Sequence, residues 1–123
     1  MRGDFVKQEL INKMITIGKI FYDRGWLSAT SGNLSARHGN EIIITGSGKH
    51  KGFLSEKDFL VLNLDGEILE GFGKPSGETQ YHLQLYRKFE KVNAIIHTHS
   101  VYSSLVSLIA ENCLEWWPIL KNT

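Results

Sequence analysis

The sequence NLSARHGNEIIIT, residues 33–45, is the stretch that decides the fold. It predicts two strands, Asn33–His38 and Glu41–Thr45, because the helical hydrophobic spacing of the preceding residues stops here. Gly39-Asn40 lies between the two strands, and such a pair is typical of a hairpin turn. A β-sheet is therefore expected to start at this point.

Further strands follow along the chain. Residues 59–64 and 67–69 lie on either side of Asp65-Gly66, which is a second strong hairpin signal. Residues 92–96 form a short apolar run that is predicted to be another strand and to end at a group of histidines.

Helical segments surround these strands. Between Asp4 and Arg24, apolar residues recur every three or four positions and form one stripe that is expected to face the core: Val6, Leu10, Met14, Ile17 and Phe21. A short helix is predicted to start at residues 55–58, a longer one to run over 78–89, and another over 101–110. This order predicts a single α/β (α+β layered) domain over residues 1–123, with helices on both faces of one sheet.

Composition excludes several classes of function. The 123 residues carry a formal net charge of +1, without the clustered Lys and Arg that a nucleic-acid surface needs. Cys113 is the single cysteine, so no intrachain disulfide is possible. The N-terminus lacks an apolar signal core, and no apolar run has the length of a membrane span. We therefore expect a cytoplasmic protein with no nucleic-acid or membrane partner.

His97 and His99 are the strongest chemical signal. Alternate residues of a strand point to the same face, so two imidazoles at this spacing can bind one metal ion. The alternative is a pair of half-buried histidines bonded to backbone groups. Two ligands are also fewer than the three protein ligands that a catalytic zinc usually has.

Glu78 is the second candidate, in the run Lys74-Pro75-Ser76-Gly77-Glu78 at the start of a predicted helix. Taken alone, its carboxylate is explained by the favourable interaction with the helix dipole. Beside a metal ion, the same group can be a ligand or can carry a proton.

Loops of small residues form the third candidate set. The runs 30–33 and 46–49 and the pair Ser76-Gly77 offer backbone N–H groups and hydroxyls of the kind that bind anions such as phosphate. Each loop alone is better explained as an ordinary turn, whereas three such loops together with the two histidines are a less ordinary set. The other histidines, His38, His50 and His82, have no partner at metal spacing and are interpreted as surface or core residues.

The order of these motifs resembles the class II aldolase/adducin family. Four runs carry the resemblance, in this order: Thr30-Ser31-Gly32-Asn33-Leu34-Ser35, Ile44-Thr45-Gly46-Ser47-Gly48, Lys74-Pro75-Ser76-Gly77-Glu78 and Ile96-His97-Thr98-His99. The resemblance implies a central, mostly antiparallel sheet between helical layers and a homo-oligomer, in the family usually a tetramer with sites between subunits.

The resemblance also implies roles for individual residues. His97 and His99 would be ligands of Zn²⁺ or another divalent metal, and Glu78 would be the catalytic group that contacts the metal or moves a proton. The substrate would be a sugar phosphate whose phosphate is bound by residues of the three loops: Thr30, Gly32, Asn33, Ser47, Gly48, Ser76 and Gly77.

Within the family, the runs 29–33, 46–52 and 74–79 look most like bacterial methylthioribulose 1-phosphate dehydratases. This implies a lyase that removes water from a ketose phosphate in methionine salvage. A sugar-phosphate aldolase or epimerase of the fuculose-phosphate type is the alternative enzyme, since it would use the same metal and phosphate loops.

The chain also departs from the family pattern. The family's third histidine ligand has no counterpart, because no histidine follows His99. Pro118 stands where the dehydratases have an acid/base glutamate. We therefore expect a chain truncated at its C-terminus, and a catalytically inactive, oligomerising family member is the non-enzymatic alternative.

Overall fold

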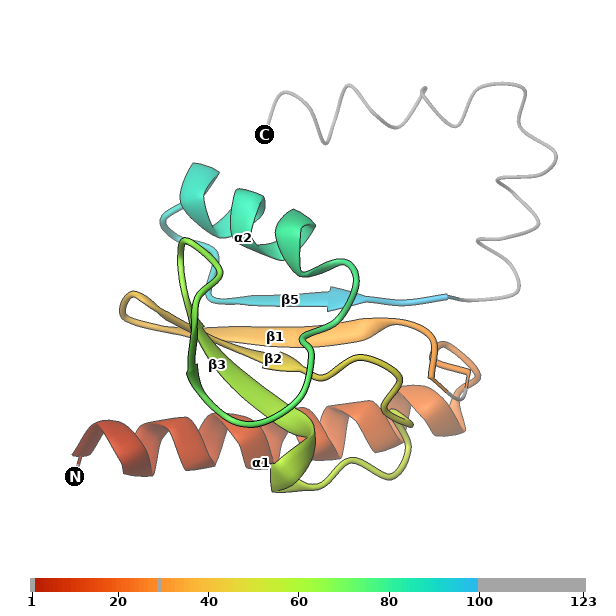
Figure 1. The fold of residues 1–123 in the computed structure, drawn as a ribbon. Coiled ribbons are helices and arrows are strands. Elements are labelled where there is room, and N and C mark those ends of the chain that lie inside the picture. The colour runs from red at the N-terminus through yellow and green to blue at the C-terminus, as the bar shows by residue number, and fades with distance from the viewer. Residues whose placement is uncertain (1, 29, 100–123) are drawn as a thin grey trace, which may run out of the picture.

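A five-stranded sheet lies between two helices in the computed structural model of the protein, which describes residues 2–28 and 30–99. Figure 1 shows one helix on each face of the sheet. The helices are α1 (Arg2–Asp23) and α2 (Thr79–Lys88). The strands are β1 (Asn33–His38), β2 (Glu41–Thr45), β3 (Phe59–Asn63), β4 (Ile68–Glu70) and β5 (Ala94–His97). The predicted layered α/β fold is confirmed, and every strand pairing is antiparallel.

Both predicted hairpins are present. Gly39 joins β1 to β2 with a φ of +61°, and Gly66 lies between β3 and β4 with a φ of +90°. Glycine adopts such positive φ angles without the steric cost that a side chain brings. The expected short helix is a single 3-10 turn, Glu56–Asp58, that leads directly into β3.

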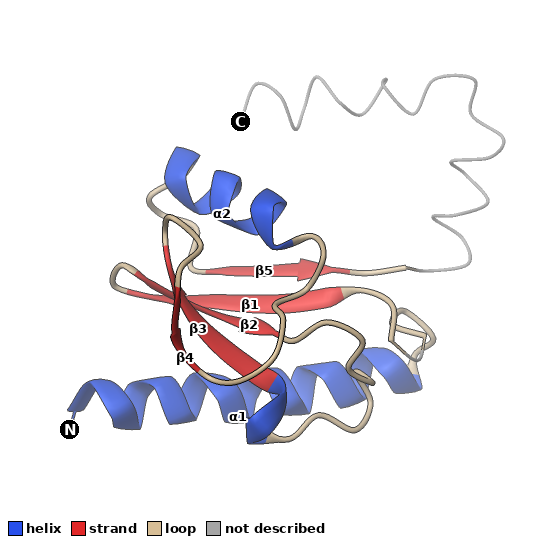
Figure 2. Cartoon of the chain, in the orientation of Figure 1, coloured by secondary structure: helices blue, strands red, loops and turns tan. Residues whose placement is uncertain are grey.

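The strand order is β4-β3-β2-β1-β5, so the last strand does not pair with its neighbour in sequence. After β4, at one edge of the sheet, the chain passes through α2. It then returns to the sheet at the opposite edge, where β5 pairs with β1 (Figure 2). The register aligns Asn33 with His97 and Ser35 with Ile95. Side chains of β1 and β5 at these positions therefore share one face.

The two faces of β1 have different chemistry. Leu34 and Ala36 face α1 and pack in a core with Met14. Asn33 and Ser35 face α2, where Ser35 contacts two side chains of that helix. The α2 face therefore combines an apolar cluster around Ile42, Leu83 and Tyr86 with a buried polar strip beside it.

Several sequence-based expectations lie outside the described residues. They are the helix over 101–110 and the expectations for Cys113 and Pro118. Within residues 2–28 and 30–99, neither helix combines the length and the apolar character that a bilayer crossing requires.

Candidate metal and substrate site

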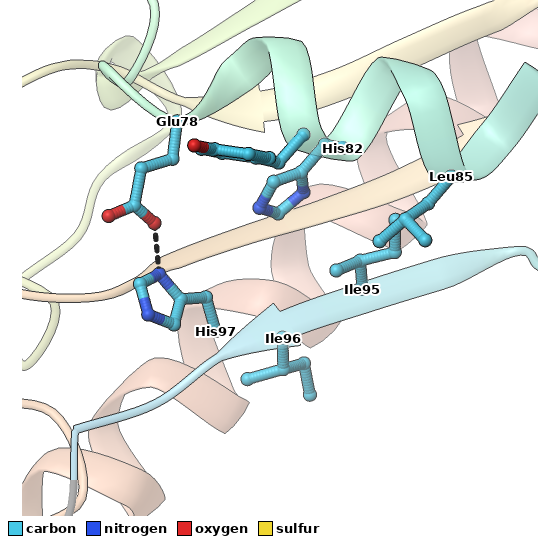
Figure 3. A pocket seen from close by; sticks show the side chains of 7 residues that line it. Glu78, His82, Leu85, Ile95, Ile96 and His97 are labelled. Atoms are coloured by element: carbon cyan, nitrogen blue, oxygen red, sulfur yellow. Dashed lines mark ion pairs between the residues drawn. The ribbon is translucent and has the colours of Figure 1, made fainter. Parts of the chain in front are cut away.

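Three potential metal ligands meet at one end of the sheet. Donor atoms of Glu78, His97 and His99 all lie within 4.8 Å of one another. Glu78 is the residue that precedes α2, and His97 is the last residue of β5. The turn into α2 and the end of β5 therefore bring a carboxylate and two imidazoles together, as Figure 3 shows for Glu78 and His97.

His99 is positioned differently from the sequence-based expectation. The expectation placed both histidines on one face of a strand, but β5 ends at His97. The backbone N–H of His99 instead donates to the carbonyl oxygen of Trp26 at 2.7 Å. This bond holds the segment after β5 against the segment after α1, and the two imidazole rings still lie with their centroids 4.5 Å apart.

Glu78 has partners on two sides. Its Oε2 atom pairs with Nδ1 of His97 and accepts a hydrogen bond from Nδ2 of Asn33 at 3.1 Å. Burial acts to raise the pKa of the Glu78 carboxyl, but the Asn33 hydrogen bond and the charges of His97 and His99 outweigh it and hold that pKa below its usual value. The carboxylate form is therefore favoured at neutral pH.

The three small-residue loops lie against one another next to these ligands. The buried ammonium group of Lys51 donates to the carbonyl oxygens of Thr30 at 2.9 Å and Lys49 at 2.7 Å, which ties the first loop to the second. The Ser47 N–H donates to the Lys74 carbonyl oxygen at 2.8 Å, which joins the second loop to the third. Burial lowers the pKa of the Lys51 amine.

The residues predicted to bind phosphate differ in exposure. Thr30, Ser47, Gly48 and Gly77 are exposed, whereas Asn33 is buried. The Asn33 amide already bonds within the chain, to the Ser76 hydroxyl at 3.0 Å as well as to Glu78. Phosphate binding by these residues stays a prediction.

The chain matches the family model described as the class II aldolase and adducin N-terminal domain over residues 12–121, which is nearly its whole length. The chain belongs to this family. The match includes all three loops, Glu78 and both histidines of the site.

Individual class II aldolase relatives support this assignment. A methylthioribulose-1-phosphate dehydratase of Azotobacter vinelandii is 44% identical over 102 residues, covering 82% of this chain and 50% of the relative. An L-fuculose phosphate aldolase of Methanococcus maripaludis is 43% identical over 101 residues, covering 82% and 54%. The chain therefore spans about half the length of these curated relatives.

The fold is also found among solved members of the family. The crystal structure of Escherichia coli YgbL, described as an aldolase, epimerase or decarboxylase, superposes with a TM-score of 0.78 at 34% identity. The superposition covers 83% of this chain and 49% of the YgbL chain.

The residues of this class II aldolase-family chain fit a divalent metal ion. Imidazole nitrogens and carboxylate oxygens bind zinc at about 2.0–2.2 Å, so ligand atoms around one ion lie within about 4 Å of each other. The observed spread of at most 4.8 Å among the three donors is compatible with this distance after small side-chain adjustments. The direct pairing of Glu78 with His97 also shows that both side chains point to one place.

Two residues near the site were missed by the sequence analysis. His82 was interpreted as a surface or core histidine, and it is buried, but its contact with Asn33, the partner of Glu78, was not expected. Lys51 was not singled out at all. The signal for His82 was present, because Glu78, His82 and Tyr86 recur every four residues and so lie on one face of α2.

Gly32 allows the first loop to approach β5. Its φ is +78°, and a Cβ atom added there would lie 2.5 Å from the carbonyl oxygen of His97 and would also overlap Leu27. We expect Gly32→Ala to lower the free energy of unfolding by about 2–4 kcal/mol, the sum of a left-handed backbone cost and an overpacking cost. Urea denaturation of the metal-free protein measures this loss.

Gly25→Ala is the matched control for this substitution. Gly25 has a similar φ of +75°, but nothing lies within 4 Å of an added Cβ atom. Only the backbone cost of about 1–2 kcal/mol is expected there. Equal losses of stability in the two variants would show that the contact between Gly32 and β5 is unimportant.

Proposed function

We propose that this chain carries the metal-binding and phosphate-binding part of a lyase that removes water from methylthioribulose 1-phosphate. The observation that carries the proposal is the convergence of Glu78, His97 and His99 within 4.8 Å, beside three loops of small residues that are bonded to one another. The relatives named as methylthioribulose-1-phosphate dehydratases, at 41–45% identity, support this choice of substrate.

Different residues are proposed to bind the two ends of the substrate. In the proposal, the exposed hydroxyl and N–H groups of Thr30, Ser47, Gly48 and Gly77 bind the phosphate and so orient the reacting carbons. His97 and His99 hold a divalent ion, for which we propose zinc. Such an ion, when bound, polarises the carbonyl oxygen of the substrate as a Lewis acid.

Glu78 is proposed to move the proton. Dehydration requires that a proton leave the carbon beside the carbonyl group and that the hydroxyl group of the next carbon depart as water. A carboxylate that lies beside two imidazoles can contact the ion, and it can also accept that proton and then return it to the departing hydroxyl group. The Asn33 hydrogen bond and the contact with His97 hold the carboxylate at this place.

A sugar-phosphate aldolase is the second candidate. The observation that favours it is the L-fuculose phosphate aldolase of Methanococcus maripaludis, which is as similar to the chain as the dehydratases are. The described residues supply the same metal and phosphate groups to either reaction. The two reactions differ in the bond that breaks, which is a C–O bond in dehydration and a C–C bond in aldol cleavage.

Product analysis distinguishes the candidates. We expect the chain, purified without chelator and supplied with zinc, to convert methylthioribulose 1-phosphate into a product that is lighter by one water molecule. Mass spectrometry detects this change, and two fragments from L-fuculose 1-phosphate would identify an aldolase instead. If the chain converts neither substrate although metal is bound, it is an inactive family member by itself.

The proposal extends to assembly and location. We propose a homo-oligomer, as a tetramer, in the cytoplasm. Exposed phenylalanines support the assembly, since Phe5 is 71%, Phe53 74% and Phe72 95% exposed in the single chain. Light scattering of the purified chain at several concentrations tests this part of the proposal.

A further inference from the structure

Four buried polar side chains form a continuous row of hydrogen bonds between α2 and β1, and the row ends at Glu78. Asn33, Ser35, His82 and Tyr86 are each 1–3% exposed. Nε2 of His82 contacts Oδ1 of Asn33, and Nδ1 of His82 lies 2.6 Å from the Ser35 hydroxyl. The Ser35 hydroxyl in turn lies 2.7 Å from the Tyr86 hydroxyl. Burying four polar groups is costly unless all of them are hydrogen-bonded, so this arrangement has a narrow range of acceptable geometries.

Burial lowers the pKa of His82 to about 4, so its imidazole is neutral near pH 7. Counting donors and acceptors then allows one set of hydrogen-bond directions for the four side chains. A carboxylate only accepts hydrogen bonds, so the NH₂ group of Asn33 must face Glu78. Oδ1 of Asn33 then faces His82 and needs a donor, which requires the proton of the neutral imidazole on Nε2. Nδ1 of His82 is therefore the acceptor for the Ser35 hydroxyl, and the Tyr86 hydroxyl donates to Ser35.

Reversing these hydrogen bonds would place two acceptor oxygens in contact at the site. If His82 carried its proton on Nδ1, Asn33 would have to turn its NH₂ group toward Nε2. Its Oδ1 atom would then face the Glu78 carboxylate, with two acceptors in contact. The imidazole tautomer and the orientation of the Asn33 amide are therefore linked.

We propose that His82 is a positioning residue that fixes the Asn33 amide and, through it, holds the Glu78 carboxylate toward the metal site. The Asn33 NH₂ group has two hydrogens, one for Glu78 and one for the Ser76 hydroxyl in a proposed phosphate loop. The inference rests on the proposed function, because it gives His82 a role toward the metal and the substrate. Figure 3 shows His82 on α2 and Glu78 directly before the first turn of that helix, with both side chains on the side that faces β5.

A first measurement uses the metal-free protein. Long-range ¹H–¹⁵N correlation spectra are expected to show His82 with its proton on Nε2. The Asn33 side-chain amide hydrogens are expected to exchange slowly with water. Ser35→Ala removes the hydroxyl that donates to Nδ1 of His82. The preference for a proton on Nε2 should then weaken, and the Asn33 amide should exchange faster.

A second measurement uses Co²⁺ alone as the probe. Loss of a group that orients a metal ligand typically costs about 10- to 100-fold in metal affinity, and we expect this loss for His82→Phe. Ser35→Ala keeps the imidazole and is expected to lose less, about 3- to 10-fold. If His82→Phe fails to fold, the Co²⁺ affinity of Ser35→Ala still tests the positioning role.

Ile43→Val is the matched control, because Ile43 is fully buried on the opposite face of the same sheet. It should weaken packing without changing the His82 tautomer, the exchange of the Asn33 amide or the Co²⁺ affinity. A general loss of stability would instead affect all three variants alike, and that result would overturn the positioning role.

The two measurements separate this inference from the proposed function. A proton on Nδ1 of His82, or Co²⁺ affinities that are equal in wild type, Ser35→Ala and His82→Phe, would overturn the inference. If the spectra agree with expectation but the wild-type chain does not bind Co²⁺, the proposed metal function fails, whereas the control of Asn33 by His82 stands.

Discussion

Replacing His97 by alanine is expected to abolish metal binding by the chain. His97 supplies one of three donor groups and contacts a second one, Glu78, directly. Outer-shell partners of a metal already change affinity by about 10- to 100-fold, so the loss of a ligand should exceed about 100-fold. Purification without chelator, followed by elemental analysis, should find one zinc or other divalent ion per wild-type chain and none in His97→Ala.

His38→Ala is the matched control for the metal measurement. His38 lies on β1 at the end opposite to Asn33 and is outside the three-ligand group. Its replacement should leave the metal content unchanged. Equal metal content in wild type and His97→Ala would remove His97 from the site, and the absence of metal from all three proteins would refute the metal-dependent proposal.

Replacing Glu78 by glutamine is expected to lower the turnover number by about 100- to 10,000-fold, the usual contribution of a general acid or base. Glutamine has nearly the same shape, and its carbonyl oxygen can still accept the hydrogen bond from Asn33. It cannot accept and return a proton. The turnover number and the metal content should be measured together at saturating zinc, so that loss of the ion is distinguished from loss of proton transfer.

Glu67→Gln is the control for this second experiment. Glu67 is an exposed carboxylate in the turn between β3 and β4, away from the ligand group. Full turnover is expected in that variant. If Glu78→Gln also retains full turnover with zinc bound, Glu78 is not the proton carrier, and its role is limited to binding.

The antiparallel register explains why the site forms at this end of the sheet. Asn33 and His97 are aligned across β1 and β5, because the first residue of β1 lies opposite the last residue of the antiparallel β5. Ser76 and Glu78 reach the same place because the Ser76 N–H donates to the carbonyl oxygen of Thr45 at the end of β2. Three segments that are distant in sequence therefore bring their polar side chains to the same end of the sheet, where strand pairing keeps them in place.

The similarity to known proteins assigns the family, and the side-chain contacts of the site indicate its chemistry. The match to class II aldolases and the similarity to both dehydratases and aldolases define the family. The contacts of Glu78, His97, Asn33 and His82 concern the chemistry of this chain. Because the chain spans about half of its curated relatives, the experiments above address the chain by itself.

The amino-acid sequence alone determined the secondary structure and the candidate ligands. Hydrophobic spacing predicted the helix that became α1. Gly39-Asn40 and Asp65-Gly66 predicted the two hairpins, because these signals are local and depend on the conformational preferences of adjacent residues. His97 and His99 also stood out locally, although β5 ends at His97 and the fixed position of His99 depends on a hydrogen bond to Trp26.

Only the tertiary structure decided which side chains meet. The pairing of β5 with β1 rather than with the strand before it depends on how α2 packs across the sheet, and local propensity carries no information about such long-range contacts. That pairing places His97 beside Asn33 and Glu78. The fold also brings His82 against Asn33, a contact that sequence spacing does not predict, since the partners of a buried polar group come from distant segments.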